Sequence, residues 1–172
     1  IEYQEGVPDR WESDEADLMI ILDFEDDSEN LDRIQLPDLP MLRLAAPDHP
    51  LSGLDMVSNE DLARYMELVV RDSSPRHRRS PKRSFGEARH LTWLGDFHSK
   101  RLALLEGAGH GWMPQHLVVE DLDAGRLVRL DTRAVDEWIY HPELVRRRSQ
   151  TLGRAGRRFV DGLLEMFEKV DD

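Results

Sequence analysis

Two segments of the sequence combine hydroxyl groups with backbone amides that suit the binding of a carboxylate or another small anion. Ser73 and Ser74 closely follow the apolar run Met66–Val70, which has the composition of a buried strand. Gly95–Ser99 joins another strand-like run to a helix, whose first turn offers N–H groups and the positive end of the helix dipole. In an open α/β sheet, ligands bind outside the carboxyl ends of the strands. We therefore predict that both segments belong to one binding site.

Each of these residues also has a purely structural interpretation, which the sequence leaves open. The two serines can form an ordinary turn in which their hydroxyls bond to nearby backbone groups. Asp96 or Ser99 can cap the helix. Phe97 can pack on a ligand ring, but the spacing of the apolar residues favours packing in the core.

Further candidates lie at the ends of other predicted strands. Arg71 is a candidate counter-charge for an acidic ligand. A surface ion pair between Arg71 and Asp72 would explain this arginine equally well. Met113 and Pro114 end a later strand, where most such pairs are structural, and Phe24 ends an apolar run elsewhere in the chain. The predicted ligand contacts are Phe24, Arg71, Asp72, Ser73, Ser74, Gly95, Asp96, Phe97, His98, Ser99, Met113 and Pro114.

Hydrophobic spacing predicts the elements that position these residues. Strands alternate with helices as in βαβ units, which predicts an α/β fold with mostly parallel sheets and flanking helices. Ser58 is a predicted helix N-cap, and Asp61 stands three residues on, as in a capping box. Strands are predicted at 16–24, 66–70, 90–94, 126–130 and 136–144, helices at 58–65 and 151–170 and from Phe97 to Gly107, and 111–122 begins as a strand and turns helical.

Charge is unevenly distributed along the 172 residues, whose net charge is −12. Residues 1–62 carry 18 acidic and 3 basic side chains, whereas Arg71–Arg89 carries 7 basic and 2 acidic ones. The basic run lacks helical spacing and regularly interleaved aromatic residues, and the acidic whole repels phosphate backbones. A solvated loop is therefore favoured over a nucleic-acid-binding patch.

No residue pattern points to catalysis, a metal or a cofactor. Cysteine is absent, and the histidine pairs lack the spacing of ligands on one helix. Gly107–Gly111 superficially resembles a dinucleotide-binding loop, but it ends a helix instead of opening one. We expect no enzymatic activity, no cofactor and no metal. The sequence also lacks a signal peptide and an apolar run of membrane-spanning length, which predicts a soluble cytoplasmic protein.

The segment Leu104–Leu130 resembles the effector-binding domain of LysR-type transcriptional regulators. That family shows, in this order, a helix ending in a Gly-x-Gly turn, a strand ending in proline, a short helix and the sequence Gly-Arg-Leu-Val. Here those motifs are Gly109–Gly111, Met113-Pro114, 121–124 and 125–128.

Two earlier segments extend the resemblance to most of the chain, from Ile1 to Phe167. Glu15–Ile20 is similar to a strand of the family's first lobe, and Leu42–Leu51 is similar to its hinge crossover. The resemblance implies a two-lobed, periplasmic-binding-protein-like fold with an effector cleft between the lobes. The implied lobes are 1–50 with 134–172, and 51–133.

The resemblance also implies partners. The effector is expected to be a small anion, and the domain is expected to form a homodimer or tetramer through the edge strand Ile1–Gly6 and the helix after Pro114. DNA is expected to bind only through a separate N-terminal winged helix-turn-helix, and no membrane partner is expected. The sequence departs from the family in lacking a first strand and helix, and in a short connection from Gly6 to Ala16.

Two other classes of protein stay open. A solute-binding protein used in transport has the same fold, and a signal peptide upstream of Ile1 would favour it. A small α/β enzyme is the third class, although no catalytic arrangement supports it. A reaction that depends on Asp96 or His98 would favour the enzyme.

Overall fold

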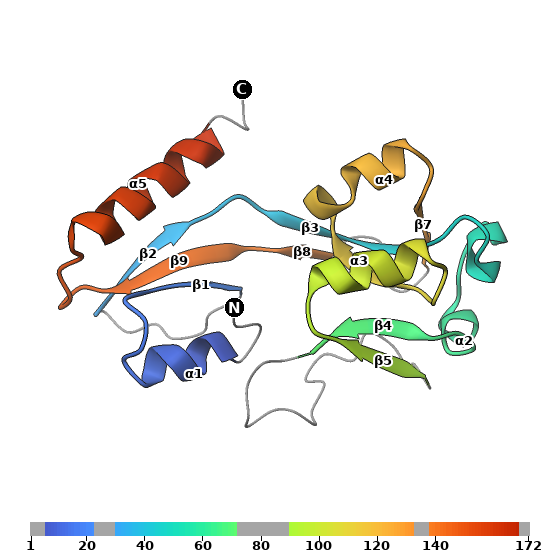
Figure 1. Cartoon of the computed structure of the whole chain (residues 1–172), viewed down its shortest axis with the longest axis horizontal. Helices are drawn as coiled ribbons and strands as arrows, with labels where there is room; N and C mark the ends of the chain where they lie inside the picture. Colours follow the sequence, from blue (N-terminus) through green and yellow to red (C-terminus); the bar gives the residue numbers. More distant parts are fainter. Residues whose placement is uncertain (1–5, 23–29, 72–89, 133–137, 169–172) are drawn as a thin grey trace. The chain divides into compact units, whose positions relative to one another are not determined.

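The chain folds into two compact units (Figure 1). Unit 1 combines Ile1–Asp38 with Tyr140–Asp172, and unit 2 is the continuous stretch Leu39–Ile139. These units differ from the predicted lobes, 1–50 with 134–172 and 51–133, at the segments 39–50 and 134–139, and the lobe division itself stays a prediction. The computed structural model describes residues 6–22, 30–71, 90–132 and 138–168.

Unit 1 contains a three-stranded antiparallel sheet. The strands have the order β1-β9-β2, and helix α1 packs against β1. The elements are α1 (Gly6–Glu12), β1 (Leu18–Leu22), β2 (Leu31–Gln35), β9 (Pro142–Arg147) and α5 (Arg154–Glu168). Its small core consists of Trp11, Met19, Leu31 and Val145.

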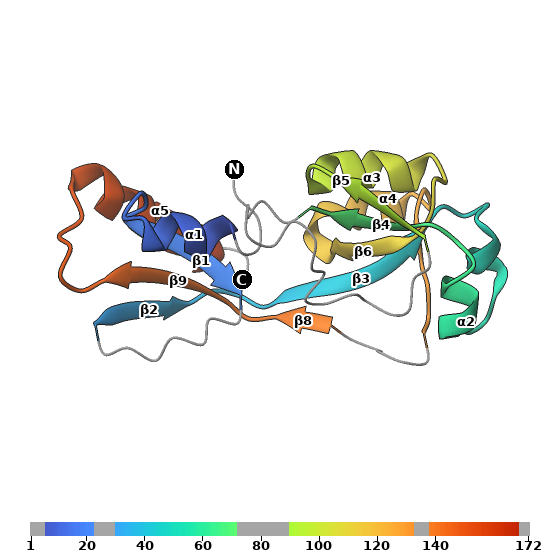
Figure 2. The ribbon, with the colours of Figure 1, turned by 90° about the horizontal axis from the view of Figure 1, so that it is seen from below.

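Unit 2 contains two groups of strands that one residue links. Strands β6 and β7 flank β3, β8 also pairs with β3, and β4 pairs with β5. His110 joins the groups, because its amide donates to the Met66 carbonyl oxygen (3.0 Å) and its carbonyl accepts from the Leu68 amide (2.8 Å). Helix α3 packs across β4, β5 and β6 (Figure 2). The strands are β3 (Leu39–Ala45), β4 (Glu67–Val70), β5 (Leu91–Leu94), β6 (Gly111–Pro114), β7 (Val128–Arg129) and β8 (Trp138–Tyr140).

The helices of unit 2 are short and lie between these strands in the sequence. They are η1 (Pro50–Gly53), α2 (Asn59–Leu62), α3 (Phe97–Leu105), η2 (Gln115–Leu117) and α4 (Val119–Asp123). The capping box predicted for α2 is confirmed. The Ser58 hydroxyl accepts a hydrogen bond from the Asp61 amide, and the Asp61 carboxylate accepts one from the Ser58 amide, both at 3.2 Å.

The strand directions differ from the expectation of mostly parallel sheets. Strand β4 runs parallel to β5, whereas the pairs β1–β9, β2–β9, β3–β6 and β3–β7 are antiparallel. The fold is therefore a mixed α/β fold, and the parallel character is not confirmed for the described strands. Alternation along the sequence predicts the order of the elements, but it does not determine which strands become neighbours.

The Gly-x-Gly turn has a steric explanation. A β-carbon on Gly109 would lie 2.2 Å from the Met66 carbonyl oxygen, far inside contact distance. One on Gly111 would lie 2.7 Å from the Leu68 carbonyl oxygen and 2.9 Å from Cε of Lys100. Only glycine allows β4 and the Lys100 side chain to approach the chain this closely.

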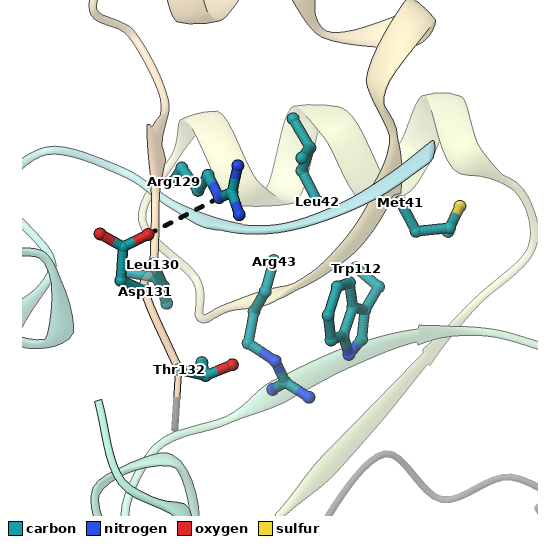
Figure 3. Close-up of a pocket in the computed structure, with 8 residues that line it drawn as sticks. All are labelled: Met41, Leu42, Arg43, Trp112, Arg129, Leu130, Asp131 and Thr132. Atoms are coloured by element: carbon teal, nitrogen blue, oxygen red, sulfur yellow. Dashed lines mark ion pairs between the residues drawn. The ribbon is translucent and has the colours of Figure 1, made fainter. Parts of the chain in front are cut away.

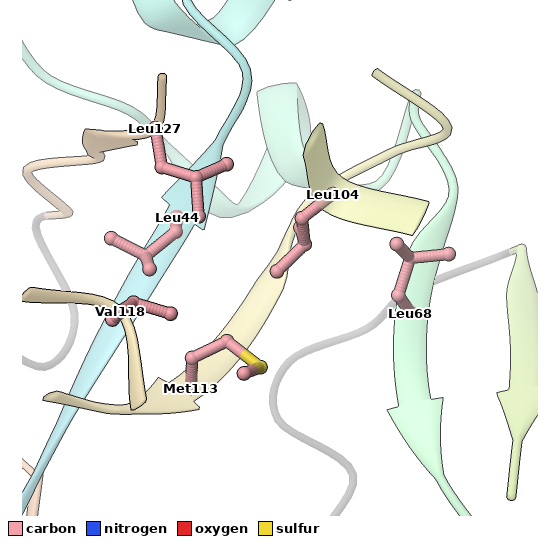
Figure 4. Close-up of a cluster of buried hydrophobic side chains, with 6 residues drawn as sticks. All are labelled: Leu44, Leu68, Leu104, Met113, Val118 and Leu127. Carbon is pink, nitrogen blue, oxygen red and sulfur yellow. The ribbon is translucent and has the colours of Figure 1, made fainter. Parts of the chain in front are cut away.

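The main hydrophobic core of unit 2 lies between α3 and its strands. Figure 4 shows the cluster, to which β3, β4, β6 and α3 each contribute a side chain. The side chain of Met113 is fully buried in this cluster, so its role there is packing in the core. The buried members are Leu44, Leu68, Leu104, Met113, Val118 and Leu127.

Candidate functional site

The parallel pair β4–β5 brings one predicted ligand contact, Arg71, next to the predicted site segment Gly95–Ser99. In its register, Val70 lies opposite Leu94, so both strands end at the same edge. The Arg71 amide then donates a hydrogen bond to the Leu94 carbonyl oxygen at 2.8 Å. The exposed Arg71 therefore stands beside the start of the segment Gly95–Ser99.

Asp96 takes the structural role that the sequence left open. It is the N-cap of α3, and the Ser99 amide donates to its Oδ1 at 2.7 Å. The hydrogen bond from the Ser99 amide, more than any other interaction, lowers the pKa of Asp96. The carboxylate therefore stays ionised at neutral pH and occupies part of the helix terminus that an external anion would use.

The remaining predicted contacts divide into accessible and packed residues. Gly95 and His98 are exposed, and Ser99 is half-buried at the same edge. Phe97 is half-buried and packs against the core cluster, which agrees with the core interpretation. Pro114 is buried at the end of β6. Four predicted contacts, Phe24, Asp72, Ser73 and Ser74, lie outside the described residues.

A buried polar cluster that the sequence analysis did not predict lies in the same unit. It consists of Arg43, Glu67, Lys100 and His110, all buried. Nη2 of Arg43 lies 3.5 Å from Oε1 of Glu67, and Nη1 of Arg43 donates to Nδ1 of His110 at 3.1 Å. Because arginine has no acceptor, Nδ1 must accept, and the hydrogen of the neutral ring is on Nε2, 3.3 Å from the Leu62 carbonyl oxygen.

Burial dominates the protonation of this cluster. It lowers the pKa of Lys100 to about 7, against the opposing attraction of Glu67. Burial, together with the smaller effect of the neighbouring Arg43, lowers the pKa of His110 to about 3. Burial also raises the pKa of Glu67, while Arg43 and Lys100 act in the opposite direction. The neutral imidazole of His110 is therefore the form present at physiological pH.

The sequence does carry a signal for this cluster. Lys100 stands three residues after Phe97 and four before Leu104, on the stripe of α3 that faces the core. A charged residue at a core-facing helix position indicates a buried, paired group. Arg43 alternates with Leu42 and Leu44 along β3, so the strand pattern places it on the opposite face from them and carries no signal of its burial.

A small hollow lies beside Arg43 and Trp112 in unit 2. Figure 3 shows Arg43, Trp112 and Thr132 around it, with the guanidinium and the indole on the same side of β3. The guanidinium carbon of Arg43 lies 5.0 Å from the centre of the Trp112 ring. At the rim, Nε of Arg129 lies 3.6 Å from Oδ1 of Asp131. None of the predicted contacts lines this hollow.

The described part of the chain carries no arrangement typical of a metal centre or a membrane span. Among these residues, no three His, Cys, Asp or Glu side chains are grouped so that they could hold a metal ion. Within the same ranges, every helix is too short or too polar to cross a bilayer.

Comparison with known proteins identifies the family. The LysR substrate binding domain matches residues 2–168, nearly the whole chain. The chain belongs to this family. An uncharacterised HTH-type transcriptional regulator, YeeY of Escherichia coli K12, is 27% identical over 145 residues, which cover 80% of this chain and 46% of the relative. The chain spans less than half of the length of the curated relatives it matches.

Solved LysR regulatory domains have the same fold. The CcmR regulatory domain of Synechocystis PCC6803, in complex with 2-PG, has a TM-score of 0.67 at 20% identity, covering 94% of this chain and 78% of that one. The effector-binding domain of QuiR, in complex with shikimate, has a TM-score of 0.67 at 16% identity, covering 96% and 78%.

Family membership decides between the classes of function. The chain is an effector-binding regulatory domain of a LysR-type transcriptional regulator, and it is not an enzyme. This excludes the small α/β enzyme. It also favours the regulatory domain over a transport protein of the same fold.

Proposed function

We propose that this regulatory domain binds a small anionic effector at the carboxyl edge of β4 and β5. The observation that carries the proposal is the hydrogen bond between Arg71 and Leu94, which sets Arg71 beside Gly95–Ser99. The side chain of Arg71 is exposed, and guanidinium groups bind carboxylates and phosphates with two parallel hydrogen bonds. The complexes of CcmR with 2-PG and of QuiR with shikimate support a small-molecule effector.

Other predicted contacts belong to the same proposal. Ser73 and Ser74 follow Arg71 in the sequence and would add hydroxyl donors. The predicted position of the effector between two lobes stays a prediction, as do the contacts from Phe24 and Asp72. For the residues outside the described ranges, parallel strand pairing also stays a prediction.

The effector would act by favouring one conformation of the regulator. A ligand shifts such an equilibrium only by its difference in affinity for the two states. In the longer protein, a separate helix-turn-helix domain would contact DNA, as the name of the E. coli relative suggests.

We also propose that the effector-binding domain forms a homodimer or tetramer. The exposed Leu117 and Val119, on the helices after Pro114, support one predicted surface, whereas most of the other, residues 1–5, lies outside the described ranges.

The proposal predicts that Arg71 contributes to affinity for anions. A panel of small carboxylates and phosphates would be screened by thermal shift, and hits would be titrated by calorimetry. Arg71→Gln should weaken binding of a hit about tenfold, because a charged hydrogen bond is lost. The matched control is Arg64→Gln, which removes the same charge from another exposed position. Saturable binding that Arg71→Gln leaves unchanged would contradict the proposed site.

A second variant tests the sign of the ligand charge. Asp96→Asn keeps a good N-cap but removes a negative charge at the edge. An anionic effector should therefore bind Asp96→Asn more tightly than it binds the wild type. Weaker binding by this variant would favour a cationic effector and would overturn the anionic part of the proposal.

A further inference from the structure

Helix α5 exposes an apolar line that its own unit leaves uncovered. Ala155, Phe159, Gly162 and Met166 are spaced by four, three and four residues, so they lie along one side of the helix. All four are exposed, and the two large side chains are 55% and 62% accessible. Exposed lines of large apolar side chains at this spacing are typical of helices that pair with another helix.

Several charges of α5 are placed unfavourably for an isolated helix. Arg154 and Arg158 are four residues apart near the N-terminus, and Asp161 and Glu165 are four apart in the second half. Like charges at this spacing repel, and their order along the helix opposes the helix dipole. Within the described ranges, no ion pair compensates these four side chains.

We propose that α5 pairs antiparallel with α5 of a second copy of this chain. In that arrangement the large Phe159 of one copy faces the small Gly162 of the other, and Met166 faces Ala155. No atom of its own chain lies within 4 Å of a β-carbon built on Gly162, so there is open space for the phenyl ring. A parallel pair would instead set Phe159 against Phe159 and leave a void between the glycines.

The charges favour the same arrangement. Arg158 and Glu165 each precede a large residue of the apolar line by one position, so they flank the contact. In the antiparallel pair, Arg158 of each copy lies beside Glu165 of the other, giving two complementary pairs. The two helix dipoles then also run in opposite directions.

The expected dimer is weak because the contact is small. A helix of 15 residues is about 22 Å long. Two such helices bury less than the roughly 1,200–2,000 Å² typical of stable complexes. The surface differs from the self-association surfaces proposed above, and two different surfaces in one chain are what a tetramer needs.

Sedimentation equilibrium of the whole chain over a wide concentration range tests the pairing. Gly162→Leu fills the space that receives Phe159, while leucine favours the helix and meets no atom of its own chain. We expect self-association to weaken at least about tenfold. Gly53→Leu, another glycine with open surroundings, is the control and should change nothing. A chain that is monomeric at every concentration, or an association that Gly162→Leu leaves unchanged, overturns the proposal.

Charge reversal tests the direction of the pair. Arg158→Glu and Glu165→Arg should each weaken self-association, because both flanking pairs become repulsive. An equimolar mixture of the two variants should restore association, since both pairs are again complementary in the mixed dimer. Stronger association of Arg158→Glu alone, or no recovery in the mixture, overturns the antiparallel arrangement. None of these measurements requires an effector, so they stand apart from the test of the effector site.

Discussion

At the scale of residues, the sequence predicts the polar edge better than it predicts the buried polar network. Arg71 and the segment Gly95–Ser99 are brought together because each directly follows a strand, and strand ends are visible in the sequence. The partners in the buried network, Arg43, Glu67 and His110, come from three separate segments. Only the tertiary fold brings them within bonding distance.

His110 should make the stability of the domain sensitive to acid. Its pKa is about 3 in the folded state, against about 6.5 for an unperturbed histidine. The unfolded state therefore binds more protons between these values, so stability is complete above pH 6.5 and falls as the pH falls towards 3. Protonation of Nδ1 would also break its hydrogen bond from Arg43.

The variant His110→Gln tests this, because glutamine does not titrate. Urea unfolding would be compared for both proteins at several pH values. Between pH 6.5 and about 5, the wild type should lose about 2 kcal/mol more than the variant. The exposed His116→Gln is the control and should follow the wild type. Equal losses in His110→Gln and the wild type would contradict the assigned pKa.

At the scale of elements, capping residues and apolar runs predicted individual helices and strands, but they did not predict which strands pair with each other. The capped helix after Ser58 and the strands β4 and β5 are found as predicted, because capping and apolar runs are properties of a few adjacent residues. The antiparallel pairing of β3 with β6 and β7 joins residues far apart in the sequence. Alternation of strand and helix carries no information about such pairs.

The chain at the start of β4 lies very close to the Gly-x-Gly turn, so a side chain added at this turn should destabilise the domain. Gly109→Ala places a β-carbon 2.2 Å from the Met66 carbonyl oxygen, so the backbone must move apart. We expect a loss of about 3 kcal/mol in the free energy of unfolding, measured by urea titration. Gly53→Ala is the control and should stay within about 0.5 kcal/mol, because nothing lies near its added β-carbon. A mild effect at Gly109 would show that β4 approaches less closely.

At the scale of the whole molecule, the unit boundary lies earlier than the sequence suggests. The predicted boundary after residue 50 comes from the resemblance to LysR effector-binding domains. Strand β3, however, places Leu44 in the main core of unit 2 and pairs with β6 and β7. Burial and pairing therefore assign it to unit 2, and neither is visible in local composition.

This assignment predicts that the fragment Leu39–Ile139 folds alone. Among the described residues, two of the three hydrophobic clusters lie wholly within this fragment, and so do the strands that pair with β3, except the last residue of β8. A fragment of this size with its own core should melt in one cooperative transition, measured by circular dichroism and calorimetry. Leu44→Ala should lower the free energy of unfolding of the fragment by about 2–5 kcal/mol, because Leu44 is fully buried. A fragment without a cooperative transition would mean that unit 2 needs unit 1 in order to fold.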